Sequence, residues 1–250
     1  MASGHFSPLE HISFTFAITG VSRSLLAQLT RHRIASFSVQ SQRYVNAKNP
    51  DYVVPDEIKS NPHALRIMED FMNQASRAYS DIHTYLLSAE LKEKYAGFVK
   101  HNGLNLVFEN DPKYFHFALQ SQMDNMIKDD PSPENTALYR QYRIDRFAAE
   151  KRANENARAV LPNAVCTNLV MTMNARELLH FFKLRCCNRA QKEIRDLSDK
   201  MLVLCKQVAP TIFQNAGAPC THGSCPEGKL SCGNPRVATE KNSKGGKENG

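Results

Sequence analysis

The side chains with the greatest capacity for chemistry are concentrated between residues 31 and 43. The candidates in this range are three guanidinium groups, one imidazole and two of the serine hydroxyls: Arg31, His32, Arg33, Ser36, Ser41 and Arg43. A guanidinium fork binds phosphate in a bidentate manner, and serine hydroxyls add hydrogen bonds. Cations at the end of a helix also complement its dipole, which is a purely structural explanation. The segment therefore indicates an anion site or a charged helix end, and the residues alone leave both open.

A second group of polar side chains follows Asn174. Arg176 and His180 are four residues apart, so they share one face of a predicted helix. Arg185 lies nine residues beyond Arg176, near the opposite face. It can serve a site together with them only if the helix stands between two sites, as a helix at a subunit interface does. Otherwise the three are ordinary surface charges of a helix.

The elements that position the first group follow from hydrophobic periodicity. Residues 12–18 alternate between large apolar and small side chains, which predicts a half-buried strand ended by Gly20. Residues 21–33 predict a helix capped by Ser22. Residues 34–44 lack helical periodicity and predict a loop or a short strand.

The rest of the chain is mainly helical in pattern. An apolar, β-branched run predicts a strand over residues 165–173, and Asn174 is expected to cap the helix that follows. Helical periodicity also covers four further segments: 61–100, 113–127, 133–158 and 188–213. This mixture predicts an α+β fold. Residues 216–250 are rich in Gly, Pro, Lys and Ser, which predicts a tail that is disordered over 241–250.

Composition narrows the class of protein. With 32 basic and 25 acidic residues the net charge is +7, which suits an anionic partner or simply a basic surface. The lysine-rich end adds the hypothesis of a nucleic-acid-binding protein. No apolar run approaches the roughly 20 residues that span a bilayer. Because the first four residues also lack the pattern of a secretory signal, we expect a cytoplasmic protein without membrane contact.

The seven cysteines are odd in number, which argues against a disulfide scaffold. Four lie in apolar, regular segments and are expected to be buried thiols: Cys166, Cys186, Cys187 and Cys205. Cys220, Cys225 and Cys232 lie in the tail. Their spacing is wider than the paired C-x2-C of zinc sites, so no metal is predicted.

Three ordered blocks carry a resemblance to a known family. Residues 31–43 resemble the signature R-H-R-x-x-S-x4-S-x-R of flavin-dependent thymidylate synthases. The segment P-L-E-H at residues 8–11 resembles the P-F-E-H block that precedes a strand in this family. R-A-V-L-P at residues 158–162 ends twelve residues before N-A-R at 174–176, and A-Q-x-E-I follows at 190–194.

The resemblance covers most of residues 5–215 and implies a reaction. Members of this family convert dUMP to dTMP by reductive methylation, with methylenetetrahydrofolate as the carbon source and FAD, reduced by NADPH, as the hydride source. It also implies a central sheet flanked by long helices and a homotetramer with active sites at subunit interfaces. The family domain is then expected over residues 1–215, with a variable helical region at about 85–150, and the tail follows.

The resemblance also assigns roles by position. The positions of flavin-binding side chains hold His11, Arg31, His32, Arg33, Asn174, Arg176 and His180. The positions of dUMP-binding side chains hold Gln28, Arg31, Ser41, Gln42, Arg43, Arg158 and Arg185. Arg185 matches the arginine thought to polarise the uracil and favour ionisation at N3, so it is the predicted catalytic residue. A fixed cation beside a developing oxyanion is the expected device. The reaction involves no nucleic-acid partner.

Departures from the family pattern support an alternative. Family members usually carry a substantial segment before the P-F-E-H block, whereas Met1 lies only a few residues upstream of it here. Val39 stands where Glu or Gln is usual, and Lys192 where Trp is common. The alternative is a truncated, non-catalytic relative that binds flavin or nucleotide only.

Overall fold

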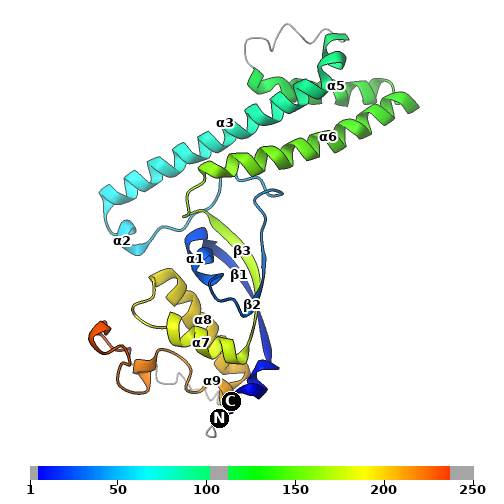
Figure 1. Cartoon of the computed structure of the whole chain (residues 1–250). Helices are drawn as coiled ribbons and strands as arrows, with labels where there is room; N and C mark the ends of the chain where they lie inside the picture. Colours follow the sequence, from blue (N-terminus) through cyan, green and yellow to red (C-terminus); the bar gives the residue numbers. More distant parts are fainter. Residues whose placement is uncertain (1–4, 102–111, 237–250) are drawn as a thin grey trace, which may run out of the picture. The chain divides into compact units, whose positions relative to one another are not determined.

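The computed structural model describes residues 5–101 and 112–236. The chain divides into two compact units, which Figure 1 colours along the sequence. The sheet unit comprises residues 1–39 and 167–250, and the helical unit comprises residues 40–166. Among the described residues, no helix is both long and apolar enough to cross a bilayer.

The described strands form one sheet in the order β1-β3-β2. Their bounds are β1 (Ser13–Ser22), β2 (Ala35–Val39) and β3 (Cys166–Asn174). β2 runs antiparallel to β3, with Ala35 opposite Met173 and Val39 opposite Leu169. Because side chains alternate between the two faces of a strand, Leu169, Met171 and Met173 are all buried on one face. That face is the sheet's side of the core.

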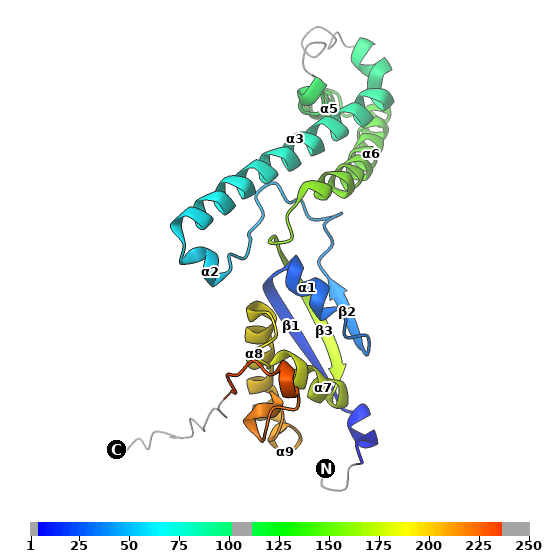
Figure 2. The ribbon, with the colours of Figure 1, turned by 60° about the vertical axis from the view of Figure 1, so that its left-hand side comes forward.

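Helices cover the buried face of this sheet. They are α1 (Arg23–Leu29), α7 (Ala175–Arg185), α8 (Lys192–Val208) and α9 (Pro210–Phe213). In both ribbon views α7 and α8 lie side by side against the strands (Figures 1 and 2). Phe181, Phe182 and Phe213 are fully buried in the shared core. This packing fixes the direction of α7 and therefore the side chains at its two ends.

The helical unit is built on two long antiparallel helices. α3 (Pro62–His101) and α6 (Pro133–Ala157) run side by side, and α5 (Phe115–Asp129) packs against both (Figures 1 and 2). The short helix α2 (Asp56–Lys59) precedes α3. Leu91, Leu119, Met123 and Tyr142 are among the fully buried members of a second core between these helices. Single 3-10 turns are η1 (Ser7–Glu10), η2 (Pro112–Tyr114), η3 (Arg158–Val160), η4 (Pro219–Thr221) and η5 (Gly228–Leu230).

Most of the predicted elements are confirmed. The α+β class, the strand at 165–173 and the helices at 61–100, 113–127 and 133–158 all have counterparts in the structure. Asn174 caps α7, because its Oδ1 accepts a hydrogen bond from the backbone N–H of Glu177 at 2.8 Å. The predicted disorder of 241–250 and the predictions for residues 1–4 lie outside the described residues, and the boundary at 215 stays a prediction.

Two predictions around the first motif are wrong. Gly20 does not end β1, which continues to Ser22 because the Oδ1 of Asn168 accepts the Gly20 N–H at 3.0 Å; Gly20 has a φ of +67°. The helix predicted over 21–33 ends at Leu29. The hydroxyl of Thr30 donates to the carbonyl of Leu26, and the backbone after it leaves the helix in a tight turn.

The prediction of a single helix over 188–213 is also wrong, because two helices lie in this range. α8 ends at Val208, and α9 begins at Pro210. Ala209 lies between them with φ −142° and ψ 61°. A residue before proline is pushed out of the helical region by the proline ring, which explains the break. Among the cysteines expected to be buried, Cys186 and Cys205 are, whereas Cys166 and Cys187 are half-buried.

Candidate active site

The R-H-R motif lies in the turn that follows α1. Ser22 caps this helix by accepting a hydrogen bond from the N–H of Leu25 at 3.0 Å. After the helix ends, Arg31 and Arg33 are exposed, whereas His32 is only 6% exposed. The turn therefore directs the imidazole into the sheet unit and leaves both guanidinium groups at the surface, where an anionic group can reach them.

His32 is held between side chains of α7. Nε of Arg185 donates to Nε2 of His32 at 3.0 Å, and Nδ1 of His32 faces Oε1 of Glu177 at 3.4 Å. The ring packs edge-on against Phe181, and the ring of His180 lies 6.4 Å away, centroid to centroid. Burial, and then the positive charge of Arg185, lower the pKa of His32, while Glu177 opposes them. His32 is therefore neutral, with its hydrogen on Nδ1.

The two ends of α7 supply different predicted functions. At its start, Asn174 acts as the N-cap and orders Glu177, the carboxylate that faces His32. At its end, Arg185 is half-buried, and burial lowers its pKa. A guanidinium remains charged in proteins even so. The helix thus holds a partly desolvated cation next to a neutral imidazole.

Arg176 has a different partner from Arg185. Its guanidinium forms an ion pair with Glu10, the last residue of η1. The N–H of Ala175 also donates to the carbonyl of Ile12 at 2.7 Å. The P-L-E-H segment is thereby joined to the start of α7, with His11 exposed beside the contact. Sequence reasoning missed Glu10, although its place inside the motif was an available signal.

The A-Q-x-E-I block fixes α1. Glu193 accepts two hydrogen bonds from Ser22, from its N–H at 2.7 Å and its hydroxyl at 2.6 Å. Gln191 accepts from Nε2 of Gln28 at 3.2 Å. The block therefore holds the start of α1 and orients Gln28, one of the predicted nucleotide-binding residues.

The remaining nucleotide-binding candidates lie in the helical unit, around Glu155. Nε of Arg43 forms an ion pair with Oε2 of Glu155 at 2.9 Å, and Nε of Arg158 donates to the Glu155 carbonyl at 3.2 Å. The Ser41 hydroxyl accepts from the N–H of Arg43 at 3.2 Å, and Gln42 is half-buried between them. The end of α6 thus brings Arg158 together with Arg43, which is distant from it in sequence, and Ser41 is bonded to Arg43.

Two buried polar side chains, Tyr79 and Asn154, support this group from inside the helical unit. The hydroxyl of Tyr79 donates to Oδ1 of Asn154 at 2.9 Å and accepts from the N–H of Ala47 at 3.2 Å. Nδ2 of Asn154 donates to the carbonyl of Arg43 at 3.1 Å. Tyr79 is fully buried and Asn154 is 5% exposed. The two side chains therefore fix the backbone of residues 43–47, and neither was found from the sequence.

Comparison with known proteins gives the same family as the motifs. The sequence model of the family described as thymidylate synthase complementing protein matches residues 1–211. The chain is 40% identical over 233 residues to the flavin-dependent thymidylate synthase of Clostridium tetani, a match covering 93% of this chain and 74% of the relative. It is 42% identical over 235 residues to the enzyme of that name from Nitratidesulfovibrio vulgaris, covering 93% and 73%. The chain belongs to the flavin-dependent thymidylate synthase family.

The sheet unit fits the flavin that the family name specifies. FAD carries two phosphates, and the family motifs place three exposed guanidinium groups on this unit: Arg31, Arg33 and Arg176. Guanidinium is the preferred donor for phosphate oxygens. Of these, Arg176 is already neutralised by Glu10, so a flavin phosphate at that position would share it or replace the carboxylate.

Two side chains depart from the flavin-dependent thymidylate synthase pattern, Val39 and Lys192, and each has contacts within this chain that accommodate it. Val39 ends β2 and packs against the core of the sheet unit. Lys192 begins α8 and forms an ion pair with Asp196 at 2.5 Å. An apolar side chain at position 39 and a cation at position 192 are therefore both compatible with this fold.

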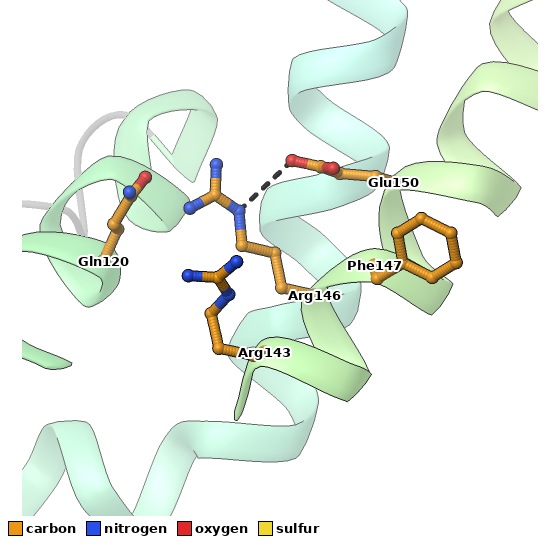
Figure 3. A pocket seen from close by; sticks show the side chains of 5 residues that line it. All are labelled: Gln120, Arg143, Arg146, Phe147 and Glu150. Atoms are coloured by element: carbon orange, nitrogen blue, oxygen red, sulfur yellow. Dashed lines mark hydrogen bonds and ion pairs between the residues drawn. The ribbon is translucent and has the colours of Figure 1, made fainter. Parts of the chain in front are cut away.

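A separate pocket lies in the helical unit. Its volume is about 310 Å³, and it is lined by Gln120, Arg143, Arg146, Phe147 and Glu150 (Figure 3). Nε of Arg146 donates to Oε1 of Glu150 at 3.2 Å, and the guanidinium of Arg143 lies beside that of Arg146. The flavin-dependent thymidylate synthase motifs contribute none of its lining residues, so it is not part of the candidate active site.

Proposed function

We propose that the chain catalyses the reductive methylation of dUMP to dTMP, with methylenetetrahydrofolate as carbon donor and NADPH as the source of reducing equivalents. The observation that carries this proposal is the contact between Arg185 and His32. It joins the R-H-R turn to the end of α7, so that two motif blocks distant in sequence form one polar cluster. FAD, when bound, would supply the hydride to the nucleotide.

The flavin would be held by the sheet unit. Arg31 and Arg33 are exposed at one turn, where their forks suit the diphosphate. The neutral ring of His32 fixes this turn from inside, and His180 lies beside it. Asn174, Arg176 and His11 complete the set at the start of α7. The exposed His11 would face the flavin ring and the folate.

The nucleotide phosphate would be bound by the group around Glu155. Arg43 and Arg158 supply guanidinium nitrogens, Ser41 supplies a hydroxyl, and Gln42 supplies a side-chain amide. The carboxylate of Glu155 orients Arg43 in the absence of the anion, which reduces the ordering cost of binding. Gln28 and Arg31, two further predicted dUMP-binding residues, belong to the sheet unit.

Arg185 would be the catalytic residue. Negative charge develops on the uracil oxygens and N3 as the ring is activated for attack on carbon. A cation that is partly desolvated interacts more strongly with that charge than one in water. The low pKa of His32 is useful here, because a neutral imidazole does not repel the guanidinium beside it.

A homotetramer with active sites at subunit interfaces is the assembly we propose. It is supported by α7, whose Arg176 and Arg185 have different partners. A mass measurement in solution, by light scattering, tests this arrangement; a monomer that is active at all concentrations contradicts it.

The first experiment is a flavin-binding and turnover measurement on the full chain. The purified protein is mixed with FAD, desalted and examined for the visible bands of oxidised flavin. NADPH oxidation and dTMP formation are then followed with dUMP and methylenetetrahydrofolate. We expect retained flavin and dTMP that depends on dUMP. Retained flavin without any dTMP contradicts the synthase and supports a non-catalytic flavoprotein, and a colourless protein contradicts the flavin site itself.

A further inference from the structure

The turn after Arg185 is held by residues from near the end of the described chain. Arg185 is the last residue of α7, and Cys186 is the residue that ends the helix. The last carbonyls of a helix lack partners within the helix. Here Nη1 of Arg236 donates to the carbonyl of Cys186 at 2.6 Å. A side chain 50 residues away therefore holds the carbonyl of the residue that directly follows the predicted catalytic residue.

Arg236 is itself fixed by a bidentate ion pair. Its Nη1 and Nη2 donate to the two carboxylate oxygens of Asp199, on α8, at 2.8 and 2.7 Å. The side chains of both residues are about two-thirds or more buried, with 27% and 33% exposed. A planar fork on a carboxylate permits one orientation, which an ammonium group cannot reproduce. Arg236 thus links α8 to the end of α7.

Other contacts bring the same segment to the same turn. Nδ2 of Asn188 donates to the carbonyl of Asn234 at 2.8 Å, and Arg189 forms an ion pair with Glu227 at 2.9 Å. The N–H of Arg236 donates to Sγ of Cys220 at 3.3 Å. The ion pair of Arg189 is well exposed on both sides, so it adds little. The anchoring therefore depends mainly on Arg236.

The segment and the turn together line an open pocket that includes Arg185. Its volume is about 340 Å³. One wall comes from the end of α7 and the turn, with Lys183, Arg185 and Arg189, and the other from the segment, with Pro219, Cys220 and Pro226. In both ribbon views this segment, orange to red, lies beside α7 and α8 (Figures 1 and 2). The match to the family model ends at residue 211, before this wall begins.

We propose that Arg236 is a positioning residue for Arg185, and that residues 219–236 form one wall of the site in which Arg185 acts. The proposal rests on the proposed function, because it assigns Arg236 a part in the same reaction. Arg236 touches no reacting atom; it holds the backbone from which Arg185 reaches His32 and the pocket. A displacement of a catalytic group by about 1 Å can cost on the order of 10²-fold in rate.

The test compares R236Q, R236K and a control, K200Q, in the full-length protein. Lys200 is exposed on α8, next to Asp199, so K200Q removes one charge from the same region. We expect R236Q to lower kcat at least 10-fold while flavin is retained and the KM for dUMP changes less. R236K should recover part of kcat, because it restores the charge without the fork. K200Q should match the wild type.

A second measurement is independent of turnover. Cys187 and Cys220 are half-buried in the pocket wall, and their rates of labelling by a maleimide report whether the segment is held. We expect faster labelling in R236Q and unchanged labelling in K200Q, with melting temperatures recorded for each variant. Faster labelling with unchanged kcat overturns the positioning role, and unchanged labelling overturns the anchoring. Absence of dTMP in the wild type contradicts the proposed function itself, which is distinct from a loss confined to R236Q.

Discussion

Nε of Arg185 lies 3.0 Å from Nε2 of His32 and donates a hydrogen bond to it. A guanidinium has no acceptor, so Nε2 must be unprotonated and the imidazole must carry its hydrogen on Nδ1. The lowered pKa of His32 agrees with this tautomer. The middle residue of the R-H-R motif is therefore part of a buried cluster that orients a cation, while its two neighbours face outward.

Replacing Arg185 by lysine tests that cluster. The R185K variant keeps a positive charge but loses the planar fork, so it cannot bond His32 through Nε and face the uracil together. We expect kcat to fall about 10²-fold, the order found when a preorganised donor to a developing oxyanion is removed. Steady-state kinetics with dUMP and NADPH measure it, and K200Q is the matched control. Equal kcat in R185K and the wild type would contradict a catalytic role.

The helical unit should become less stable below neutral pH. Burial, and then the charge of Arg146, lower the pKa of His116 to about 4, against 6.5 in the unfolded chain. The Ser88 hydroxyl donates its single hydrogen to the carbonyl of Lys113 at 2.7 Å. It must therefore accept a hydrogen bond from Nδ1 of His116, 2.8 Å away. Between pH 6.5 and about 4 the unfolded chain binds more protons, so stability is complete above this window and falls as the pH drops through it.

The expected loss from His116 alone is on the order of 3 kcal/mol across that window. Urea denaturation followed by circular dichroism at pH 7 and pH 4.5 measures it. H116Q should show a smaller pH dependence than the wild type, whereas H63Q, at an exposed position of α3, should not differ from it. A wild-type stability that is constant or rises on acidification is the opposite of the expected result. His83 and His32 have lowered pKa values and act in the same direction.

Local patterns in the sequence predicted the elements but not the contacts that join them. The cap at Asn174 and the strand at 165–173 depend on neighbouring residues, so type and spacing were sufficient. The spacing of Arg176 and Arg185 correctly separated them on α7, yet it could not show that Arg185 meets His32. That contact depends on where the turn after α1 lies in the folded unit.

The errors have the same origin. Gly20 was expected to end a strand because glycine usually interrupts one, but Asn168 supplies an acceptor from 148 residues away. Sequence reasoning also missed Glu155, whose carboxylate pairs with Arg43 and whose backbone carbonyl accepts from Arg158. It likewise missed Arg236, which lies in the segment predicted to be a tail. Contacts between residues that are distant in the sequence do not change its hydrophobic periodicity, so they cannot be predicted from that pattern.

The contact between Ser22 and Glu193 should stabilise the sheet unit. Ser22 is 2% exposed, caps α1 and donates its hydroxyl to Glu193. Ser22→Ala removes the cap and leaves a partly buried carboxylate oxygen without that donor. We expect a loss of about 1–3 kcal/mol in the free energy of unfolding. Chemical denaturation measures it against Ser24→Ala in the same helix, and equal stability of the two variants would show that the contact contributes nothing.

Tyr79 should affect nucleotide binding without touching the nucleotide. Tyr79→Phe removes a buried hydroxyl that bonds Asn154 and the N–H of Ala47, and so loosens the backbone that carries Arg43. We expect a loss of about 1–3 kcal/mol in stability and a higher KM for dUMP with a smaller change in kcat. Tyr139→Phe removes a bond to Asp124 in the same unit and is the control, with KM unchanged. If both variants raise the KM equally, the effect comes from general loosening of the helical unit rather than from the support of Arg43.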